Sequence, residues 1–165
     1  MKGMIVYSFA LRDREPNPCN ILLAQAARRI IDGQEESDTL VVVAQRTVAL
    51  ALRQLGVSIE HVVVKREGYE GSEGVTDQAA VVFRRHRVTE VIPVAQPFLQ
   101  LTKCLELVRK NGFRTPSFFR LCRMIGWIGF DPWSKQPWCR GPIRFTVHAI
   151  RQVLFGYRPP AELSE

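Results

Sequence analysis

The sequence has few of the features that mark secreted, membrane-spanning or metal-binding proteins. Its four cysteines form no CxxC pair and no Cys/His cluster with zinc-like spacing. No apolar run approaches the ~20 residues of a membrane span. The apolar run near the N-terminus is too short for a signal peptide. These absences predict reduced, packed cysteines, no metal site, no transmembrane segment and a cytoplasmic location.

Acidic residues are scarce in the last third of the chain. From Lys103 to Arg158 there are eleven Lys and Arg but only Glu106 and Asp131, so this stretch carries +9 while the whole chain carries +7. Ten of the fifteen aromatic residues lie between Phe113 and Tyr157. The pI near 9.7 favours an anionic partner. The basic charge and the aromatic rings are therefore concentrated together, in the last third of the chain.

The first hundred residues alternate between strand-like and helix-like patterns. Apolar stretches without polar alternation occupy 4–10, 39–44, 61–65 and 90–95. Segments with helical spacing separate or follow them at 20–31, 47–55, 76–86 and 97–111. Strands of this kind are typical of a parallel sheet covered on both faces. The pattern predicts one domain, 1–165, whose fold is α/β: a doubly wound, Rossmann-like three-layer sandwich of four to five mostly parallel strands.

Three local signals refine this prediction. Asn17 before Pro18 is typical of a helix cap followed by proline at the first helical position. Pro93 lacks an amide donor, so its strand should lie at an edge or carry a bulge. After Gly112 the βα rhythm ends, and we expect a basic aromatic segment, 113–160, with helices at 118–128 and 143–155, packed on the domain.

Ligands of parallel α/β sheets bind beyond the carboxyl ends of the strands. Two strands end in Val-Ala-Gln, which places Gln45 and Gln96 at equivalent exits. Because an amide cannot act as acid, base or nucleophile at neutral pH, such exits favour binding over reaction and leave an enzymatic activity undecided. The candidate ligand-binding residues are Ser8, Asn17, Gln45, Arg46, Glu70, Thr76 and Gln96.

The segment EGYEGSEGVTD is the most site-like in the chain. Its glycines allow close backbone approach, and Thr76 or Asp77 can cap the following helix. Its spacing matches neither dinucleotide nor phosphate-loop motifs, and its carboxylates oppose a bare phosphate. It is either a surface loop with a helix cap, or a loop whose Glu70 accepts hydrogen bonds from the hydroxyls or amine of a nucleoside-type ligand.

A second hypothesis concerns the segment FFRLCRMIGWIGFDPWSKQPW and the helix after it. Rings mixed with cations can lie at an anionic membrane surface or stack on single-stranded nucleic acid. The same rings can instead fill a last core layer, with the arginine stems lying over it. The candidate contact residues are Arg120, Arg123, Trp127, Trp133, Lys135, Arg144 and Arg151.

The order of these features resembles the YdcF/SanA/ElyC-like family of α/β domains, most of them of unknown function. The resemblance rests on a polar loop and helix in EPNPCNILLAQAARRI, and on Glu70 followed after five residues by Thr76. It extends through VIPVAQPFLQLTKCLELVRKNGF and the terminal RGPIRFTVHAIRQVLFG. The resemblance implies the same fold, and it implies S-adenosylmethionine as a possible ligand, since some members are reported to bind it.

The chain departs from the family pattern at its polar positions. Ala44, Gln45 and Arg46 stand where the family usually has Ser-Gly-Gly. Leu99 and Thr102 align with the family's His and Arg, and Ala79 aligns with its Asn. The resemblance therefore implies a retained fold with an altered site.

Overall fold

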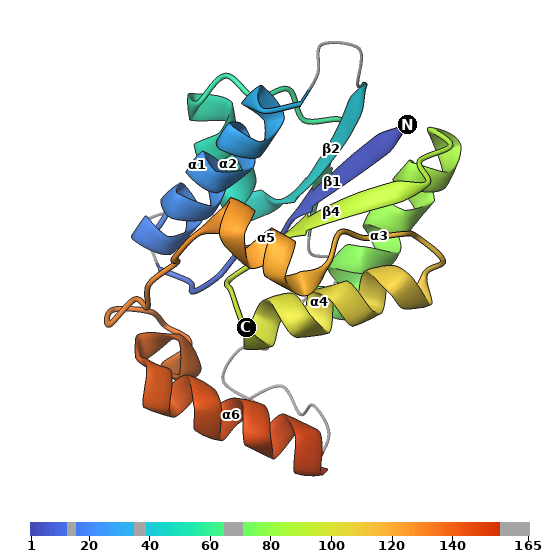
Figure 1. Cartoon of the computed structure of the whole chain (residues 1–165). Helices are drawn as coiled ribbons and strands as arrows, with labels where there is room; N and C mark the ends of the chain where they lie inside the picture. Colours follow the sequence, from blue (N-terminus) through green and yellow to red (C-terminus); the bar gives the residue numbers. More distant parts are fainter. Residues whose placement is uncertain (13–15, 35–38, 65–70, 156–165) are drawn as a thin grey trace.

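The computed structural model describes residues 1–12, 16–34, 39–64 and 71–155, without the side chains of 149 and 152–155 (Figure 1). Its sheet contains four strands: β1 (Lys2–Val6), β2 (Leu40–Gln45), β3 (His61–Val63) and β4 (Glu90–Val94). All three strand pairs are parallel, in the order β3-β2-β1-β4. The strands are apolar because helices cover both faces of the sheet.

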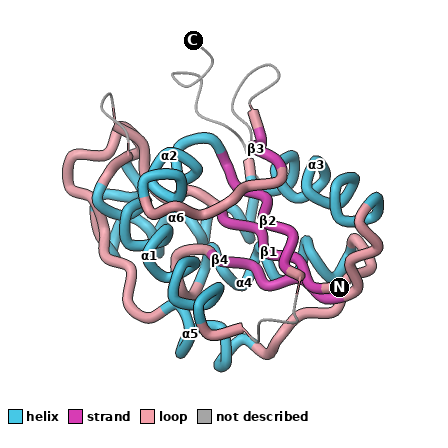
Figure 2. Tube along the Cα trace, turned by 90° about the horizontal axis from the view of Figure 1, so that it is seen from above, coloured by secondary structure: helices cyan, strands magenta, loops and turns pink. Residues whose placement is uncertain are grey.

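Five of the helices belong to the body of the fold: α1 (Pro18–Asp32), α2 (Arg46–Gln54), α3 (Ser72–Arg85), α4 (Leu99–Lys110) and α5 (Phe118–Ile125). Helices α1 and α2 pack together on one face of the sheet, and α3 and α4 pack together on the other (Figure 2). The core lies between these layers and the strands. The structure confirms the predicted doubly wound α/β sandwich.

Pro93 lies in β4, which forms one edge of the sheet. The N–H of Val91 donates outward to Arg114 O at 2.8 Å, whereas Val94 O accepts inward from Tyr7 N at 2.9 Å. Because alternate residues of a strand face opposite neighbours, Pro93 faces outward like Val91. Its missing N–H therefore costs no bond to β1, and the predicted edge position is confirmed.

Two predicted helix limits are wrong. The helix predicted from Thr76 begins earlier, at Ser72, with Gly71 as its N-cap. Thr76 therefore lies inside α3 and does not cap it. The helix predicted to reach Ile128 ends at Ile125, because Gly126 follows it with φ 76°, a conformation that glycine adopts readily.

The remaining elements lie beyond the end of the sheet at which the strands finish. They are a short 3-10 helix, η1 (Pro137–Arg140), and α6 (Pro142–Phe155). Helix α5 contacts α1 and β4, whereas α6 packs mainly on η1 and extends away from the body (Figure 1). The ring of Phe145 on α6 meets Phe9 and Phe130 edge to face, at 5.5 and 5.7 Å between centroids.

Candidate functional site at the strand ends

The strand order places a change of direction between β1 and β4. In doubly wound sheets the crevice outside the carboxyl ends of such a strand pair is the usual ligand site. Ser8 follows β1 and Gln96 follows β4, so two of the predicted site residues lie at this crevice. What covers these two residues decides whether a ligand can reach the crevice.

Residues 126–136 cover the β4 side of this crevice. Ile128 is buried, and its carbonyl accepts from Gln96 Nε2 at 3.5 Å. Gly129 O accepts from the thiol of Cys19 on α1, also at 3.5 Å. Gln96 is consequently only 1% exposed, although Gln45 is partly exposed at the end of β2. The two exits predicted to be equivalent therefore differ in access.

An ion pair and several main-chain bonds hold this covering segment in place. Arg12 Nε donates to Asp131 Oδ2 at 2.6 Å, and its Nη2 donates to Oδ1. Leu11 N donates to Ser134 Oγ at 3.1 Å, and Lys135 N donates to Leu11 O at 2.7 Å. The hydrogen bonds from Arg12 hold the pKa of Asp131 below its usual range, against the opposing effect of burial. The segment is thus fixed to the loop that follows β1.

Glutamine side chains hold the main chain of Ser8 in place. Ser8 N–H donates to Gln45 Oε1 at 3.0 Å, so the Gln45 side chain supplies an acceptor where β2 itself has ended. Gln100 Nε2 donates to Ser8 O at 2.9 Å, and Gln100 Oε1 accepts from Gln96 N at 2.9 Å. The ends of β1, β2 and β4 are thereby linked through side-chain amides.

Two buried side-chain oxygens in the described residues have no hydrogen-bond partner, Thr47 Oγ1 and Gln96 Oε1. Thr47 lies two residues beyond the end of β2, and Gln96 lies two residues beyond the end of β4. Buried polar atoms are normally satisfied, and an unsatisfied one often marks the place of a water molecule or a ligand group. Both unsatisfied atoms thus follow the carboxyl ends of strands.

Two of the predicted ligand-binding residues are instead buried and bonded within the protein. Asn17 caps α1 as predicted: its Oδ1 accepts from Asn20 N at 2.9 Å and its Nδ2 donates to Ala10 O at 3.1 Å. These bonds support Ala10, a non-glycine residue with φ 66°. Asn17 therefore shapes the loop after β1 and, at 1% exposure, has no open face for a ligand.

Thr76 is the second of these residues. Its hydroxyl bonds to Tyr7 OH at 2.8 Å and donates to Ser72 O at 2.6 Å, one turn back along α3. The predicted role of Thr76 as a cap beside the ligand is wrong, because a threonine inside a helix can bond to the carbonyl four residues earlier. Burial raises the pKa of Tyr7 well above its ordinary value and that of neighbouring Cys104 to about 12. This cluster is neutral and structural.

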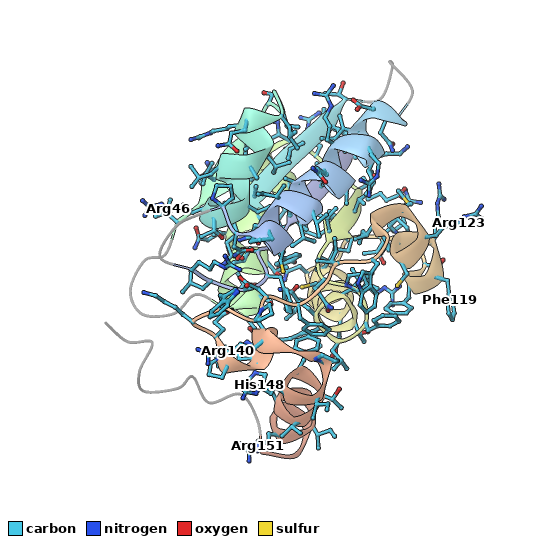
Figure 3. The ribbon with its side chains drawn as sticks, turned by 90° about the vertical axis from the view of Figure 1, so that its left-hand side faces the viewer. Arg46, Phe119, Arg123, Arg140, His148 and Arg151 are labelled. Atoms are coloured by element: carbon cyan, nitrogen blue, oxygen red, sulfur yellow. The ribbon has the colours of Figure 1, made fainter. Side chains whose placement is uncertain are left out.

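The remaining predicted residues are Arg46 and Glu70. Arg46 is exposed in the first turn of α2, whose N-cap residue, Gln45, makes no side-chain capping bond (Figure 3). Glu70 lies outside the described residues. The structure thus brings together Ser8, Gln45 and Arg46 on the accessible side of the strand ends.

The sequence analysis did not predict two further residues at the strand ends, Gln100 and Thr47. Gln100 could have been found, because it follows Gln96 by four residues, a spacing that indicates contact at a helix start.

All seven residues of the C-terminal hypothesis are exposed: Arg120, Arg123, Trp127, Trp133, Lys135, Arg144 and Arg151. They do not form one surface. Phe119 and Arg123 on α5 project from one side of the molecule, whereas Arg151 lies at the far end of α6 (Figure 3). Other rings of the segment, including Phe130 and Phe145, pack against the core. The aromatic segment therefore divides into a packed part and an exposed part.

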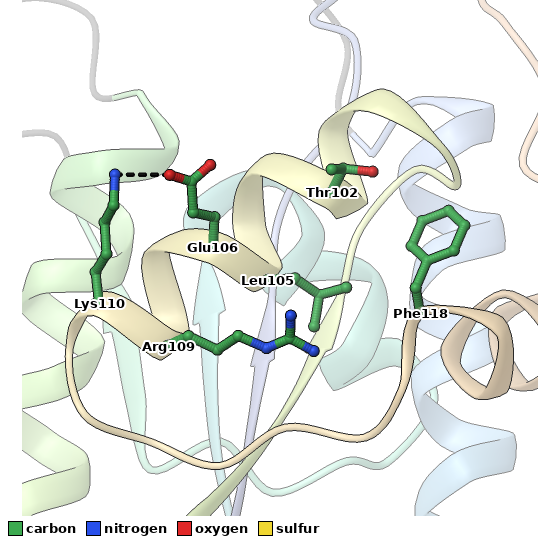
Figure 4. Close-up of a pocket in the computed structure, with 6 residues that line it drawn as sticks. All are labelled: Thr102, Leu105, Glu106, Arg109, Lys110 and Phe118. Carbon is green, nitrogen blue, oxygen red and sulfur yellow. Dashed lines mark ion pairs between the residues drawn. The ribbon is translucent and has the colours of Figure 1, made fainter.

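A surface pocket of about 640 Å³ lies on α4, lined by Thr102, Leu105, Glu106, Arg109, Lys110 and Phe118 (Figure 4). Its charged groups are engaged locally. Glu106 pairs with Lys110 at 2.7 Å, and Arg109 Nε donates to Thr115 Oγ1 at 2.9 Å. Thr102 Oγ1 donates to Phe98 O at 2.6 Å. These internal pairings leave the strand ends as the better candidate for a polar ligand.

The chain matches no protein-family model, no curated protein and no solved structure. Among the described side chains, no three of His, Cys, Asp or Glu gather as metal ligands. None of the described helices is both long enough and apolar enough to cross a bilayer.

Proposed function

We propose that the protein binds a small polar ligand, of nucleoside type or of similar hydrogen-bonding character, at the carboxyl ends of β1 and β2. The observation that carries this proposal is the unsatisfied buried oxygen Thr47 Oγ1, just beyond the end of β2; the other such atom, Gln96 Oε1, lies under residues 126–136. Everywhere else in the described chain, buried side-chain polar atoms have partners. A ligand that supplies hydrogen-bond donors here would satisfy the unpaired acceptor.

The accessible part of the edge favours the β1–β2 side. Residues 126–136 cover Gln96, whereas Ser8 and Gln45 are partly exposed and Arg46 is exposed. In this proposal the Ser8 hydroxyl and the Gln45 amide orient the ligand, Arg46 contacts an anionic or carbonyl group, and Glu70 accepts from hydroxyls or an amine. Amides, hydroxyls and guanidinium do not titrate near pH 7, which favours binding over proton transfer.

Assignment to the YdcF-like proteins, with S-adenosylmethionine as one candidate ligand, is part of the same proposal. Its support is the parallel α/β fold and the order of sequence features. The donors and acceptors of Ser8 and Gln45 suit the polar atoms of a nucleoside. The ribose hydroxyls of such a ligand would need a carboxylate, and Glu70 is the residue that the resemblance offers for them.

The test is a thermal-shift panel with S-adenosylmethionine, adenosine, nucleotides, sugar phosphates and short oligonucleotides. A ligand at 100 times its dissociation constant stabilises the folded state by ~2.7 kcal/mol, or roughly 5 °C or more at this chain length. Glu70→Ala and Gln45→Ala should remove the shift without unfolding the protein. Gln54→Ala, an exposed glutamine at the other end of α2, is the matched control and should keep it.

A shift that survives both Glu70→Ala and Gln45→Ala would overturn the assignment of the ligand to the strand ends. The absence of a thermal shift with every small molecule in the panel would overturn the proposed ligand class. A shift with oligonucleotides alone, lost as salt rises, would move the function to the basic C-terminal third.

A further inference from the structure

Helix α6 carries an apolar stripe that faces solvent. Ile143 is 80% exposed, Val147 45% and Ile150 52%. These residues follow one another at spacings of four and three, which places them along one face of an α-helix. Three aliphatic side chains in a row on this exposed helix face form an apolar surface.

The opposite face of α6 is already occupied. Phe145 packs edge to face against Phe9 and Phe130. The imidazole of His148 stacks on Trp138, with 4.5 Å between centroids and 9° between the planes. Burial, and then the nearby Lys103 and Arg151, lower the pKa of His148, which favours the neutral ring. These contacts hold α6 with its apolar stripe turned away from the body.

The charge that α6 itself carries has one sign. Between Asp131 and Glu162 the sequence contains no acidic residue. Arg144 and Arg151, seven residues apart, share a flank of α6 beside the stripe, and both are exposed. Arg140, in η1 immediately before α6, is exposed as well (Figure 3). Asp131 cannot offset these cations, because its carboxylate is fully buried against Arg12.

We propose that α6 docks the protein on an anionic membrane surface. The stripe Ile143, Val147 and Ile150 would enter the boundary between headgroups and acyl chains, and the flanking arginines would contact anionic headgroups. A helix with an apolar face, a basic flank and no carboxylates has the composition of an interfacial helix. A nucleic acid would use the cations but would leave the exposed aliphatic stripe without a partner. This surface is independent of the strand-end ligand.

The experiment measures co-sedimentation of the full chain with phosphatidylcholine vesicles, with and without phosphatidylglycerol. Wild type should bind the anionic vesicles, and its binding should weaken as salt rises. Reversing charge in Arg144→Glu and Arg151→Glu should weaken binding about five-fold or more for each side chain, the scale of one basic residue near an anionic surface. The double variant Ile143→Ser/Ile150→Ser should weaken binding about ten-fold or more, because two buried aliphatic side chains are lost.

Matched controls separate the surface from general charge and hydrophobicity. Val147→Ser is compared with Val81→Ser, since Val81 on α3 is 47% exposed and Val147 is 45% exposed. Arg144→Glu is compared with Arg85→Glu, another exposed arginine on a helix. The variants on α6 should weaken vesicle binding, while the α3 variants should leave it unchanged. Because all these side chains are exposed, circular dichroism should show an unchanged fold.

Three results would overturn the proposal. The first is equal binding to neutral and anionic vesicles, or none to either. The second is binding to oligonucleotides but not to vesicles, with an affinity that the double variant Ile143→Ser/Ile150→Ser leaves unchanged. This result would assign the cations to nucleic acid. The third is a dimer that the same double variant converts to monomer, without vesicle binding, which would assign the stripe to a second copy of the chain.

Discussion

Arg12 and Asp131, 119 residues apart in the chain, form a two-pronged ion pair beside the end of β1. The Arg12 side chain is 30% exposed, whereas the Asp131 side chain is completely buried and also accepts from Trp133 N at 3.1 Å. This pair ties the loop after β1 to the segment that covers the β4 side of the strand ends. The shape of the accessible edge therefore depends on it.

Replacing Asp131 with asparagine should destabilise the fold by about 2 kcal/mol, because the buried end of the pair loses its charge while Arg12 keeps its own. This corresponds to a melting temperature lowered by roughly 4–8 °C at this chain length. Asp32→Asn breaks the exposed Arg28–Asp32 pair and is the control, with a much smaller change expected. Equal shifts in the two variants would show that the Arg12–Asp131 pair does not hold the covering segment.

The same pair predicts a pH dependence of stability. Arg12 lowers the pKa of folded Asp131, while an unfolded aspartate titrates near ~3.9. The stabilisation is therefore complete above about pH 4 and is lost as pH falls toward the lowered pKa of the folded state. The difference in melting temperature between wild type and Asp131→Asn should be constant near neutrality and shrink in acid. A difference that grows in acid would contradict this sign.

The four cysteines should differ in reactivity. Burial raises the pKa of Cys104 and of Cys139 to about 12, and Cys19 is 2% exposed. Cys122 on α5 is half-buried. In the native protein at pH 8, a thiol reagent should label one cysteine quickly and the other three only after unfolding. Cys122→Ser should remove the fast phase; a fast phase that survives would mean that a buried thiol is accessible.

Thr76 gives a test of the corrected helix start. Thr76→Val removes the hydroxyl shared with Tyr7 OH and Ser72 O, and should destabilise the fold by about 1–3 kcal/mol. Thr76→Ser keeps the hydroxyl and should lie closer to wild type in urea unfolding. If Thr76→Val matched or exceeded the stability of Thr76→Ser, the buried hydrogen bonds would not matter to the fold.

The sequence predicted those features of the fold that depend on interactions between residues close together in the chain. The cap at Asn17 and the edge position of Pro93 depend on one residue's own backbone chemistry, and both are confirmed. The predicted start of α3 is wrong because a threonine can either cap a helix or, inside a helix, donate its hydroxyl to a carbonyl of the preceding turn. Only the packing of Tyr7 against α3 selects the second arrangement.

The covering of the strand ends could not be predicted in this way. Val-Ala-Gln occurs at the ends of two strands, but only Gln96 is covered, by Ile128 from the segment after α5. The Arg12–Asp131 pair joins distant parts of the chain and leaves no periodic pattern in the sequence. The Gln45–Ser8 bond likewise depends on how β1 and β2 are paired in register.

The ligand at the strand ends is tested most directly by amide chemical shifts of labelled protein during titration with S-adenosylmethionine and with adenosine. We expect the backbone amides of Ser8, Gln45 and Arg46 and the side-chain amide of Gln45 to move, while the rest of the sheet stays unchanged. The pocket on α4 provides the contrast. Shifts confined to residues such as Leu105 and Phe118, or no shifts with either compound, would contradict a nucleoside-type site at the ends of β1 and β2.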